Sequence, residues 1–317
     1  MDKIRVGVVG IGYLGSRHAR IFAKLEGVSL VGLCDTDPAK KETARKFRAP
    51  FYEDYRSLFG QVDAASIVVP TQDHHRVAKE FLEQGIPLLI EKPMTKSVEE
   101  ADGLLRIARE KKCLIQVGHV ERFNSAFQAA LPFVKNPMFI ECHRLGPFKK
   151  RSLDVGVVLD LMIHDIDLTL ALIQSPVERI DGIGINVLTD AEDIANARLT
   201  FQNGAVANLT ASRLTQKSMR KIRIFAEETY LSLDTVGQKV ARYWKEKGVI
   251  HGKRIHFKRK EPLKEELAAF VEAVRTQQRP IVSGEDAREA LRVALDIQEK
   301  IKQHVRWPKT HEYSKNS

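Results

Sequence analysis

The sequence has few cysteines and no cysteine spacing typical of a metal site. Its three cysteines, Cys34, Cys113 and Cys142, are odd in number and far apart along 317 residues. A disulfide framework or a structural zinc site needs several cysteines at short, regular spacings. We therefore expect that the protein binds no metal, that its thiols are free and that it is cytoplasmic.

Long apolar runs and several well-known binding motifs are also missing. No segment approaches the roughly 18 apolar residues of a transmembrane helix, and the N-terminus lacks the pattern of a signal peptide. The chain has no G-x-x-x-x-G-K-[ST] loop, no CxxC pair and no helix-turn-helix pattern. The net charge of +10 is compatible with nucleic acid, a membrane surface or an anionic small substrate. Because the motifs and apolar runs are missing, we expect no membrane and no nucleic-acid partner. The basic run 245–260 is interpreted as a solvated hairpin.

Strands and helices alternate along the first 120 residues. Short apolar runs that end at glycine, aspartate or proline predict strands, and apolar residues at helical spacing predict the helices between them. The predicted strands are 3–10, 28–35, 64–70, 87–93 and 113–119. The predicted helices are 13–27, 37–48, 73–85 and 97–112. This alternation predicts right-handed βαβ units and a parallel sheet.

A glycine-rich turn follows the first predicted strand. Residues 10–15 read Gly-Ile-Gly-Tyr-Leu-Gly, which fits the G-x-G-x-x-G pattern of dinucleotide-binding proteins. Gly10 allows the tight turn, Gly12 lets a pyrophosphate approach the backbone, and Gly15 lets the helix pack closely. The N–H groups of the helix N-terminus then face the phosphates.

An acidic residue ends the second predicted strand. Asp35 lies 20 residues beyond Gly15, the last glycine of the turn. At this position a carboxylate accepts hydrogen bonds from the adenosine ribose. This position predicts NAD, while Lys40 and Lys41 leave NADP open. The alternative is a carboxylate that only caps a helix, a role for which Asp37 is better placed.

The residues at two strand ends resemble those of a known family. "VVPTQDHH" ends one strand and "IEKPM" ends the next, and sites of parallel-sheet enzymes lie beyond such ends. Together with the glycine turn, these runs resemble the Gfo/Idh/MocA oxidoreductases. The resemblance extends over nearly the whole chain through Pro70-Thr71, His74, Gly85 before "IPLLIEKP", Asp160-x-x-x-His164 and a closing helix over 284–304.

The resemblance implies an α/β fold with two domains. A Rossmann domain with a doubly wound parallel sheet spans 1–120, and an α/β substrate domain with a large, mostly antiparallel open sheet spans 121–305. The final helix, 284–304, packs back on the first domain, and 306–317 is a tail that we interpret as disordered. Independently, 179–188, 191–213 and 220–234 read as strands joined by short turns. In this family the sheet commonly forms a homodimer or homotetramer.

The string "LDLMIHDIDLTLAL", 159–172, is apolar but carries three aspartates and a histidine. Read as an α-helix, it places Asp160 and His164 on consecutive turns, and the expense of burying unpaired charge predicts a polar cleft beside them. His164 is alternatively a core histidine held by Asp160 or Asp167. The resemblance implies that Lys92, Asp160 and His164 are catalytic, and it leaves open whether His164 or Lys92 takes the proton. We assign Asp165 and Asp167 to structural or supporting roles.

The remaining site assignments follow from the resemblance. The predicted cofactor-binding residues are Gly10, Gly12, Tyr13, Leu14, Asp35, Pro70, Thr71, His74, Glu91 and Lys92. The predicted substrate-binding residues are His119, Glu121, Arg122 and Arg144. Further candidates for a nucleotide diphosphate or its base are Phe123, Phe148, Lys149, Lys150 and Arg151.

The run "VGHVERFNSAF", 117–127, resembles a branch of the family that oxidises the 3-hydroxyl of UDP-N-acetylglucosamine on the way to lipid A precursors. The chain departs from the family pattern at Ser125, where proline is expected, at Gly156, the remnant of a glycine-rich run, and at Met162, where glycine is common. We expect a nucleotide-sugar dehydrogenase. A dehydrogenase of a free sugar or inositol and a non-catalytic dinucleotide sensor remain as alternatives.

Overall fold

The computed structural model describes residues 3–148 and 155–304. The predicted tail, 306–317, and the cationic candidates Lys149, Lys150 and Arg151 lie outside these ranges. The chain divides into two compact units, each described below by itself. Unit 1 contains Met1–Pro132, Gly237–Val240 and Arg254–Arg292, and unit 2 contains Phe133–Val236, Ala241–Lys253 and Val293–Ser317.

Unit 1 contains a six-stranded parallel sheet in the order β3-β2-β1-β4-β5-β6. This is the strand order of a doubly wound dinucleotide-binding fold, in which the order reverses between β1 and β4. The strands are β1 (Ile4–Val9), β2 (Val28–Cys34), β3 (Phe51–Tyr52), β4 (Ala64–Ile67), β5 (Leu88–Ile90) and β6 (Ile115–Val117). The predicted parallel sheet is confirmed.

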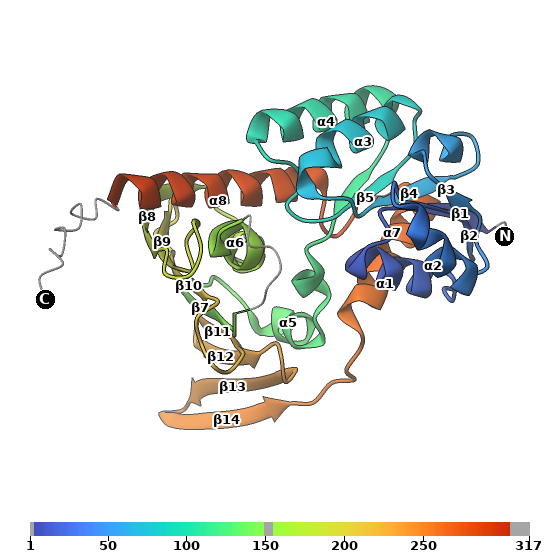
Figure 1. Cartoon of the computed structure of the whole chain (residues 1–317). Helices are drawn as coiled ribbons and strands as arrows, with labels where there is room; N and C mark the ends of the chain where they lie inside the picture. Colours follow the sequence, from blue (N-terminus) through green and yellow to red (C-terminus); the bar gives the residue numbers. More distant parts are fainter. Residues whose placement is uncertain (1–2, 149–154, 305–317) are drawn as a thin grey trace, which may run out of the picture. The chain divides into compact units, whose positions relative to one another are not determined.

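Helices cover both faces of this sheet (Figure 1). One face carries α3 and α4, and the other carries α1 and α7. The α-helices of unit 1 are α1 (Tyr13–Phe22), α2 (Lys41–Lys46), α3 (Thr71–Glu83), α4 (Val98–Lys111), α5 (Ser125–Ala130) and α7 (Pro262–Thr276). Short 3₁₀ turns add η1 (Pro38–Lys40), η2 (Tyr55–Leu58), η3 (Val120–Phe123) and η4 (Leu131–Phe133, which reaches into unit 2).

Local sequence explains where these helices begin. Ser97 accepts the backbone N–H of Glu100 at the start of α4, and Asp37 accepts that of Ala39 at the start of η1. Helix α7 was not predicted; it starts with Pro262, a residue suited to the first helical position. Buried apolar residues of α1, α7, β1 and β2 form one core, which includes Val8, Phe22, Leu33, Phe270 and Val271.

Unit 2 contains an eight-stranded, mostly antiparallel sheet in the order β14-β13-β12-β11-β7-β10-β9-β8, in which β7 and β10 are parallel. The strands are β7 (Phe139–Leu145), β8 (Val177–Ile185), β9 (Ile194–Phe201), β10 (Val206–Ser212), β11 (Met219–Ala226), β12 (Thr229–Asp234), β13 (Lys239–Glu246) and β14 (Val249–Ile255), the last two extending into unit 1. Buried and less buried residues alternate along β9, β10 and β12, so one face carries the core. The predicted fold class is confirmed.

Two helical segments of unit 2 bear on the site. A π-helix, η5 (Val158–Met162), runs directly into α6 (Ile163–Ile173), which contacts β7 and β10 of the sheet. Helix α8 (Gly284–His304) has the range predicted from the sequence; its residues up to Arg292 belong to unit 1 and the later ones to unit 2. In unit 1, Arg288 of α8 binds the carboxylate of Asp102 of α4.

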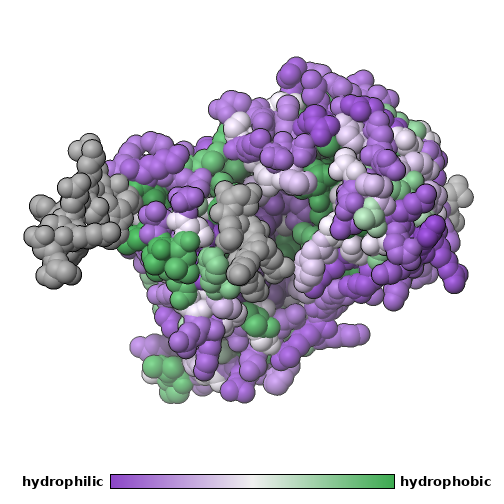
Figure 2. Space-filling model, viewed as in Figure 1, coloured by the Kyte–Doolittle hydropathy of each residue, from purple (hydrophilic) through white to green (hydrophobic). Residues whose placement is uncertain are grey.

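The outer surface is largely hydrophilic, with separate hydrophobic patches on the face drawn in Figure 2. Six aliphatic residues of unit 2 are more than half exposed, namely Ile183, Val187, Leu188, Val236, Val249 and Ile250. The last two lie in the β13–β14 hairpin, the basic segment predicted to be solvated. Across residues 3–148 and 155–304, no helix is long and apolar enough to cross a membrane.

Candidate active site

The glycine turn between β1 and α1 has the geometry expected for a phosphate-binding loop. Gly10 has φ of +88°, and a Cβ there would lie 2.5 Å from the carbonyl oxygen of Val68, so a side chain is excluded. A Cβ on Gly15 would lie 1.8 Å from the carbonyl oxygen of Gly10, whereas a Cβ on Gly12 would have nothing within 4 Å. The loop therefore leaves no room for side chains at Gly10 and Gly15 but is open at Gly12, where no side chain caps α1.

Asp35 supports this loop from the end of β2. Its carboxylate accepts the backbone N–H of Ile11 at 2.6 Å and that of Asp37 at 3.0 Å. Two oxygens have about four acceptor positions, so these bonds leave capacity for ribose hydroxyls. Tyr13 is 64% exposed at the first position of α1, where Arg17 stacks over its ring.

A cavity of about 300 Å³ lies beside Asp35. Three of the predicted cofactor-binding residues line it, Gly10, Asp35 and Pro70, and the others in its wall include Glu53, Asp54, Tyr55, Asp73 and Arg76. Its arginines are paired within unit 1, since Arg76 binds Asp73 at 2.9 Å and Arg56 binds Glu80 at 2.7 Å. The net character of the cavity is acidic, which suits ribose hydroxyls and disfavours a 2′-phosphate.

Thr71 and His74 belong to the first turn of α3, which begins directly after Pro70. His74 is 1% exposed, and its Nδ1 and Nε2 each lie 2.9 Å from a backbone carbonyl oxygen, of Pro93 and Val69 respectively. Burial lowers the pKa of His74, although the two carbonyls act to raise it. His74 therefore joins the end of β4 to the turn after β5.

That turn carries the predicted catalytic lysine. Glu91 follows β5 and is 8% exposed, Lys92 is half-buried, and the Lys92–Pro93 peptide bond is cis. The backbone N–H of Lys92 lies 3.3 Å from a carboxylate oxygen of Glu91. Among the predicted cofactor residues, the structure thus brings one group to the glycine loop and cavity, and another to the β5 turn of the same unit.

Segment 119–125 follows β6 and carries three predicted substrate residues. His119 and Glu121 are buried, at 1% and 5% exposure, and Arg122 is half-buried. Glu121 accepts a hydrogen bond from the side-chain amide of Asn124 at 3.2 Å. Ser125, which stands where the family has proline, accepts the backbone N–H of Lys260 at 2.9 Å, so this departure joins the segment to the chain that precedes α7.

Arg144, predicted as a substrate residue, lies on β7 in a buried ion pair of unit 2. Its Nε and Nη2 donate to the two carboxylate oxygens of Asp165 at 2.9 and 2.7 Å, and both side chains are 3% exposed. This bidentate pair joins the sheet to α6. The structural role that we expected for Asp165 is therefore to pair with Arg144.

Asp160 and His164 lie on either side of the junction between η5 and α6. The sequence predicted one regular α-helix over 159–172, but the π-helix places Asp160 in a wider turn than His164. Met162, where the family commonly has glycine, is fully buried. Asp160 and His164 are half-buried, and Asp167 is buried. A π-turn inside a helix is frequent at functional sites.

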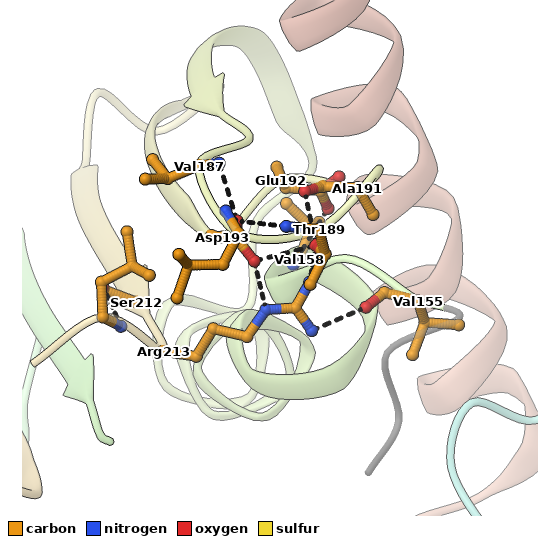
Figure 3. Close-up of polar contacts among 11 residues, drawn as sticks. Val155, Val158, Val187, Thr189, Ala191, Glu192, Asp193, Ser212 and Arg213 are labelled. Atoms are coloured by element: carbon orange, nitrogen blue, oxygen red, sulfur yellow. Dashed lines mark hydrogen bonds and ion pairs between the residues drawn. The ribbon is translucent and has the colours of Figure 1, made fainter. Parts of the chain in front are cut away.

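A polar cluster holds the loop between β8 and β9 against the start of η5 (Figure 3). Arg213 donates to Asp193 at 2.7 Å, to the carbonyl oxygen of Val155 at 3.1 Å and to the hydroxyl of Thr189 at 2.8 Å. Burial acts to raise the pKa of Asp193, but the N–H groups of Leu188 and Val187 and the guanidinium outweigh it and hold that pKa well below its usual range.

Glu192, from the same loop, caps the first turn of the site helix. Its backbone carbonyl accepts the N–H of Val157 at 2.9 Å, and its carboxylate accepts that of Val158 at 3.2 Å. Gln298 of α8 donates to the same carboxylate at 3.1 Å. The glycine that remains at position 156 fits this contact, because a Cβ there would lie 2.0 Å from the Glu192 carboxyl carbon.

Sequence reasoning did not point to Glu192, Asp193, Arg213 or the buried His18 of α1. The first three make contacts between loops that are distant in sequence, so no local sequence pattern marks them. For His18 there was a signal, because it occupies an apolar-face position of α1 between Leu14 and Phe22. In the part of the chain that the structure describes, no three His, Cys, Asp or Glu side chains are grouped to hold a metal ion.

Comparisons with known proteins agree with this fold. Residues 4–119 match the model of the oxidoreductase family with an NAD-binding Rossmann fold, and 115–232 match that of the GFO/IDH/MocA C-terminal domain. The UDP-N-acetylglucosamine 3-dehydrogenase of Acidithiobacillus ferrooxidans is 34% identical over 94% of this chain and 97% of its own. Its crystal structure has a TM-score of 0.91 and covers 96% of this chain and 99% of that one.

More distant relatives act on other sugars and polyols. The myo-inositol 2-dehydrogenase of Thermotoga maritima is 24% identical over 91% of this chain and 93% of its own. A levoglucosan dehydrogenase in complex with NADH is 16% identical, with a TM-score of 0.86 and coverage of 95% and 98% of the two chains. This last likeness concerns the fold alone.

Proposed function

Because the chain belongs to the Gfo/Idh/MocA family of oxidoreductases, we propose that it oxidises the 3-hydroxyl of UDP-N-acetylglucosamine to the 3-keto sugar with NAD. The observation that carries the substrate assignment is 34% identity over 94% of the chain to an enzyme with that activity. The acidic cavity beside Asp35 supports NAD as the cofactor.

The residues of unit 1 fit an NAD molecule. The open backbone at Gly12 and the uncapped start of α1 receive the pyrophosphate, and Asp35 receives the adenosine ribose. Bound NAD supplies the hydride acceptor at C4 of its nicotinamide. Lys92, on the turn after β5, holds the reacting oxygen with its ammonium group and stabilises the negative charge that develops there.

Removing hydride from a secondary alcohol also requires a base for the hydroxyl proton. A neutral imidazole suits this task, and we assign it to His164. Asp160 orients the ring and stabilises the cation that forms. Glu192, in the loop between β8 and β9, and Arg213, directly after β10, support both residues by holding the first turn of their helix.

The assay is NADH formation by the purified protein with UDP-N-acetylglucosamine and with myo-inositol. We expect turnover of the nucleotide sugar, and turnover of myo-inositol alone would reject the assignment in favour of a free-polyol dehydrogenase. Lys92→Ala and His164→Asn should each lower kcat by roughly 10²–10⁴ with NADH binding retained. Lys96→Ala, a change at an exposed lysine just after the same turn, is the matched control. NADH binding without turnover of either compound would favour a sensor.

We also propose that two copies of the chain associate through the open face of the eight-stranded sheet. Aromatic rings form a ladder across β7, β11, β12 and β13, with centroid distances of 5.5 Å for Phe139–Phe225, 4.7 Å for Phe225–Tyr230 and 5.5 Å for Tyr230–Tyr243. Phe225 and Tyr243 are 40% and 42% exposed, and a continuous exposed aromatic surface is typical of an interface. Light scattering should give a dimer or tetramer, and Phe225→Lys should give a monomer.

A further inference from the structure

His18 lies in the middle of α1 and is fully buried. Its Nδ1 is 2.9 Å from the hydroxyl of Ser66 on β4. Its Nε2 is 3.2 Å from a carboxylate oxygen of Glu91, although the two atoms are not aligned as a hydrogen bond. A fully buried imidazole is therefore placed against a carboxylate that is itself almost buried, and charge interactions are strong at such a site.

Glu91 has little freedom to move away from this contact. Its carboxyl group passes so close to Gly118 that a Cβ on the glycine would lie 2.8 Å from the carboxyl carbon. One of its oxygens faces the backbone N–H of Lys92 at 3.3 Å. The carboxylate thus connects His18 on one side with the backbone of Lys92 on the other.

The residue after Lys92 is held in a similar way. The carbonyl oxygen of Pro93 lies 2.9 Å from Nδ1 of the buried His74, whose other nitrogen faces the carbonyl oxygen of Val69. Lys92 consequently stands between two residues, each in contact with a buried histidine. One histidine comes from α1 and the other from α3.

We propose that His18 is a positioning residue that fixes Lys92 through Glu91 and joins it to the helix that receives the cofactor pyrophosphate. This inference rests on the proposed role of Lys92. Helix α1 begins at the glycine loop and carries His18 on its buried face, so the phosphate site and the lysine share one rigid support. A histidine that only filled the core would show no preference between its contacts with Ser66 and Glu91.

Two substitutions separate these contacts. His18→Gln places an amide N–H donor near the position of Nε2 and keeps the contact with Glu91. His18→Asn places one near the position of Nδ1 and keeps only the contact with Ser66. Ser66→Ala is the matched control, because it removes the Ser66 hydroxyl and leaves Glu91 in place.

We expect His18→Asn to lower kcat about tenfold, which corresponds to a loss of about 1.4 kcal/mol of transition-state stabilisation. The Kd for NADH should change less than about twofold. His18→Gln and Ser66→Ala should stay within about threefold of the unmodified enzyme by the same measure. A fall in His18→Gln or Ser66→Ala as large as that in His18→Asn, or no fall in His18→Asn, would overturn the proposal.

A variant that fails to fold would be recognised by its thermal midpoint, and Glu91→Gln then replaces it. Glu91→Gln keeps the size of the side chain and removes its charge, so it should lower kcat to a similar degree. The double variant His18→Asn/Glu91→Gln should be no worse than Glu91→Gln alone, since both changes act on one contact. Additive losses would contradict a shared role.

A second readout does not depend on turnover. Acetylation of Lys92 can be followed by peptide mass spectrometry. NAD should slow this acetylation at least about fivefold in the unmodified protein but less than about twofold in His18→Asn, a loss of positioning of order 1 kcal/mol. Equal protection in both would overturn the inference. Absence of sugar oxidation together with this difference would instead reject only the proposed function.

Discussion

Removing one partner of the buried pair Arg144–Asp165 should strongly destabilise unit 2. Both side chains are 3% exposed, and two hydrogen bonds of 2.9 and 2.7 Å join the guanidinium to the carboxylate. Arg144→Met removes one partner and leaves the buried carboxylate without its guanidinium. Breaking a buried pair in this way costs about 3–5 kcal/mol of unfolding free energy.

Replacing both partners should cost much less. In Arg144→Met/Asp165→Leu no charge remains in the site, and replacement of a whole buried pair by apolar residues is often neutral. We expect the double variant to recover at least about 2 kcal/mol relative to Arg144→Met. Arg179→Met breaks the exposed pair with Asp181, whose side chains are 68% and 52% exposed, and should cost no more than about 1 kcal/mol.

The assay is urea unfolding followed by tryptophan fluorescence. The chain has two tryptophans, so a Trp307→Phe background leaves Trp244 of β13, whose position in unit 2 reports on that unit. Arg144→Met should lower the unfolding midpoint far more than Arg179→Met. If the two variants lose similar stability, the pair does not hold β7 to α6 as described, and a direct role of Arg144 with the substrate becomes the better explanation.

Three further predictions follow from the site. Asp35→Ser should raise the KM for NAD roughly ten- to a hundredfold and reduce the preference over NADP, because a charged acceptor worth about 1.5–3 kcal/mol is lost; steady-state kinetics with both cofactors tests this. Gly156→Ala should lower the thermal midpoint by forcing a methyl group onto the Glu192 carboxyl group, and combination with Glu192→Ala should restore part of it. The pKa of Asp193 is lowered on folding, so its contribution to stability is present above its ordinary value of 3.8 and is lost as the pH falls toward the folded pKa. Urea midpoints between roughly pH 6 and pH 3 should therefore fall less steeply in Asp193→Asn, and an unchanged slope would contradict this.

Much of unit 1 could be predicted from sequence because its determinants are local. A glycine turn, an aspartate at a strand end and capping residues such as Ser97 act within a few positions of one another. The loop at Gly10 and the carboxylate of Asp35 are accordingly found together.

The supports of the site were beyond local patterns because each depends on a partner distant in sequence. The role of Arg144 depends on Asp165, and that of Gly156 depends on Glu192, 36 positions later by residue number. The π-helix was missed for a related reason. Helical periodicity assumes 3.6 residues per turn, whereas the observed segment holds an extra residue in a turn whose start is bonded to the distant Glu192.

The π-turn has a consequence for insertions and deletions in this chain. Removing one residue from Val158–Met162 would let the segment close into ordinary α-helical turns. A π-turn holds one residue more than an α-turn because its bonds run from i to i+5, so the residues before the deletion would keep about the same direction relative to α6. Deletion of Leu161 or Met162 would, however, leave Asp160 three positions before His164 instead of four, although both side chains of the pair would still be present.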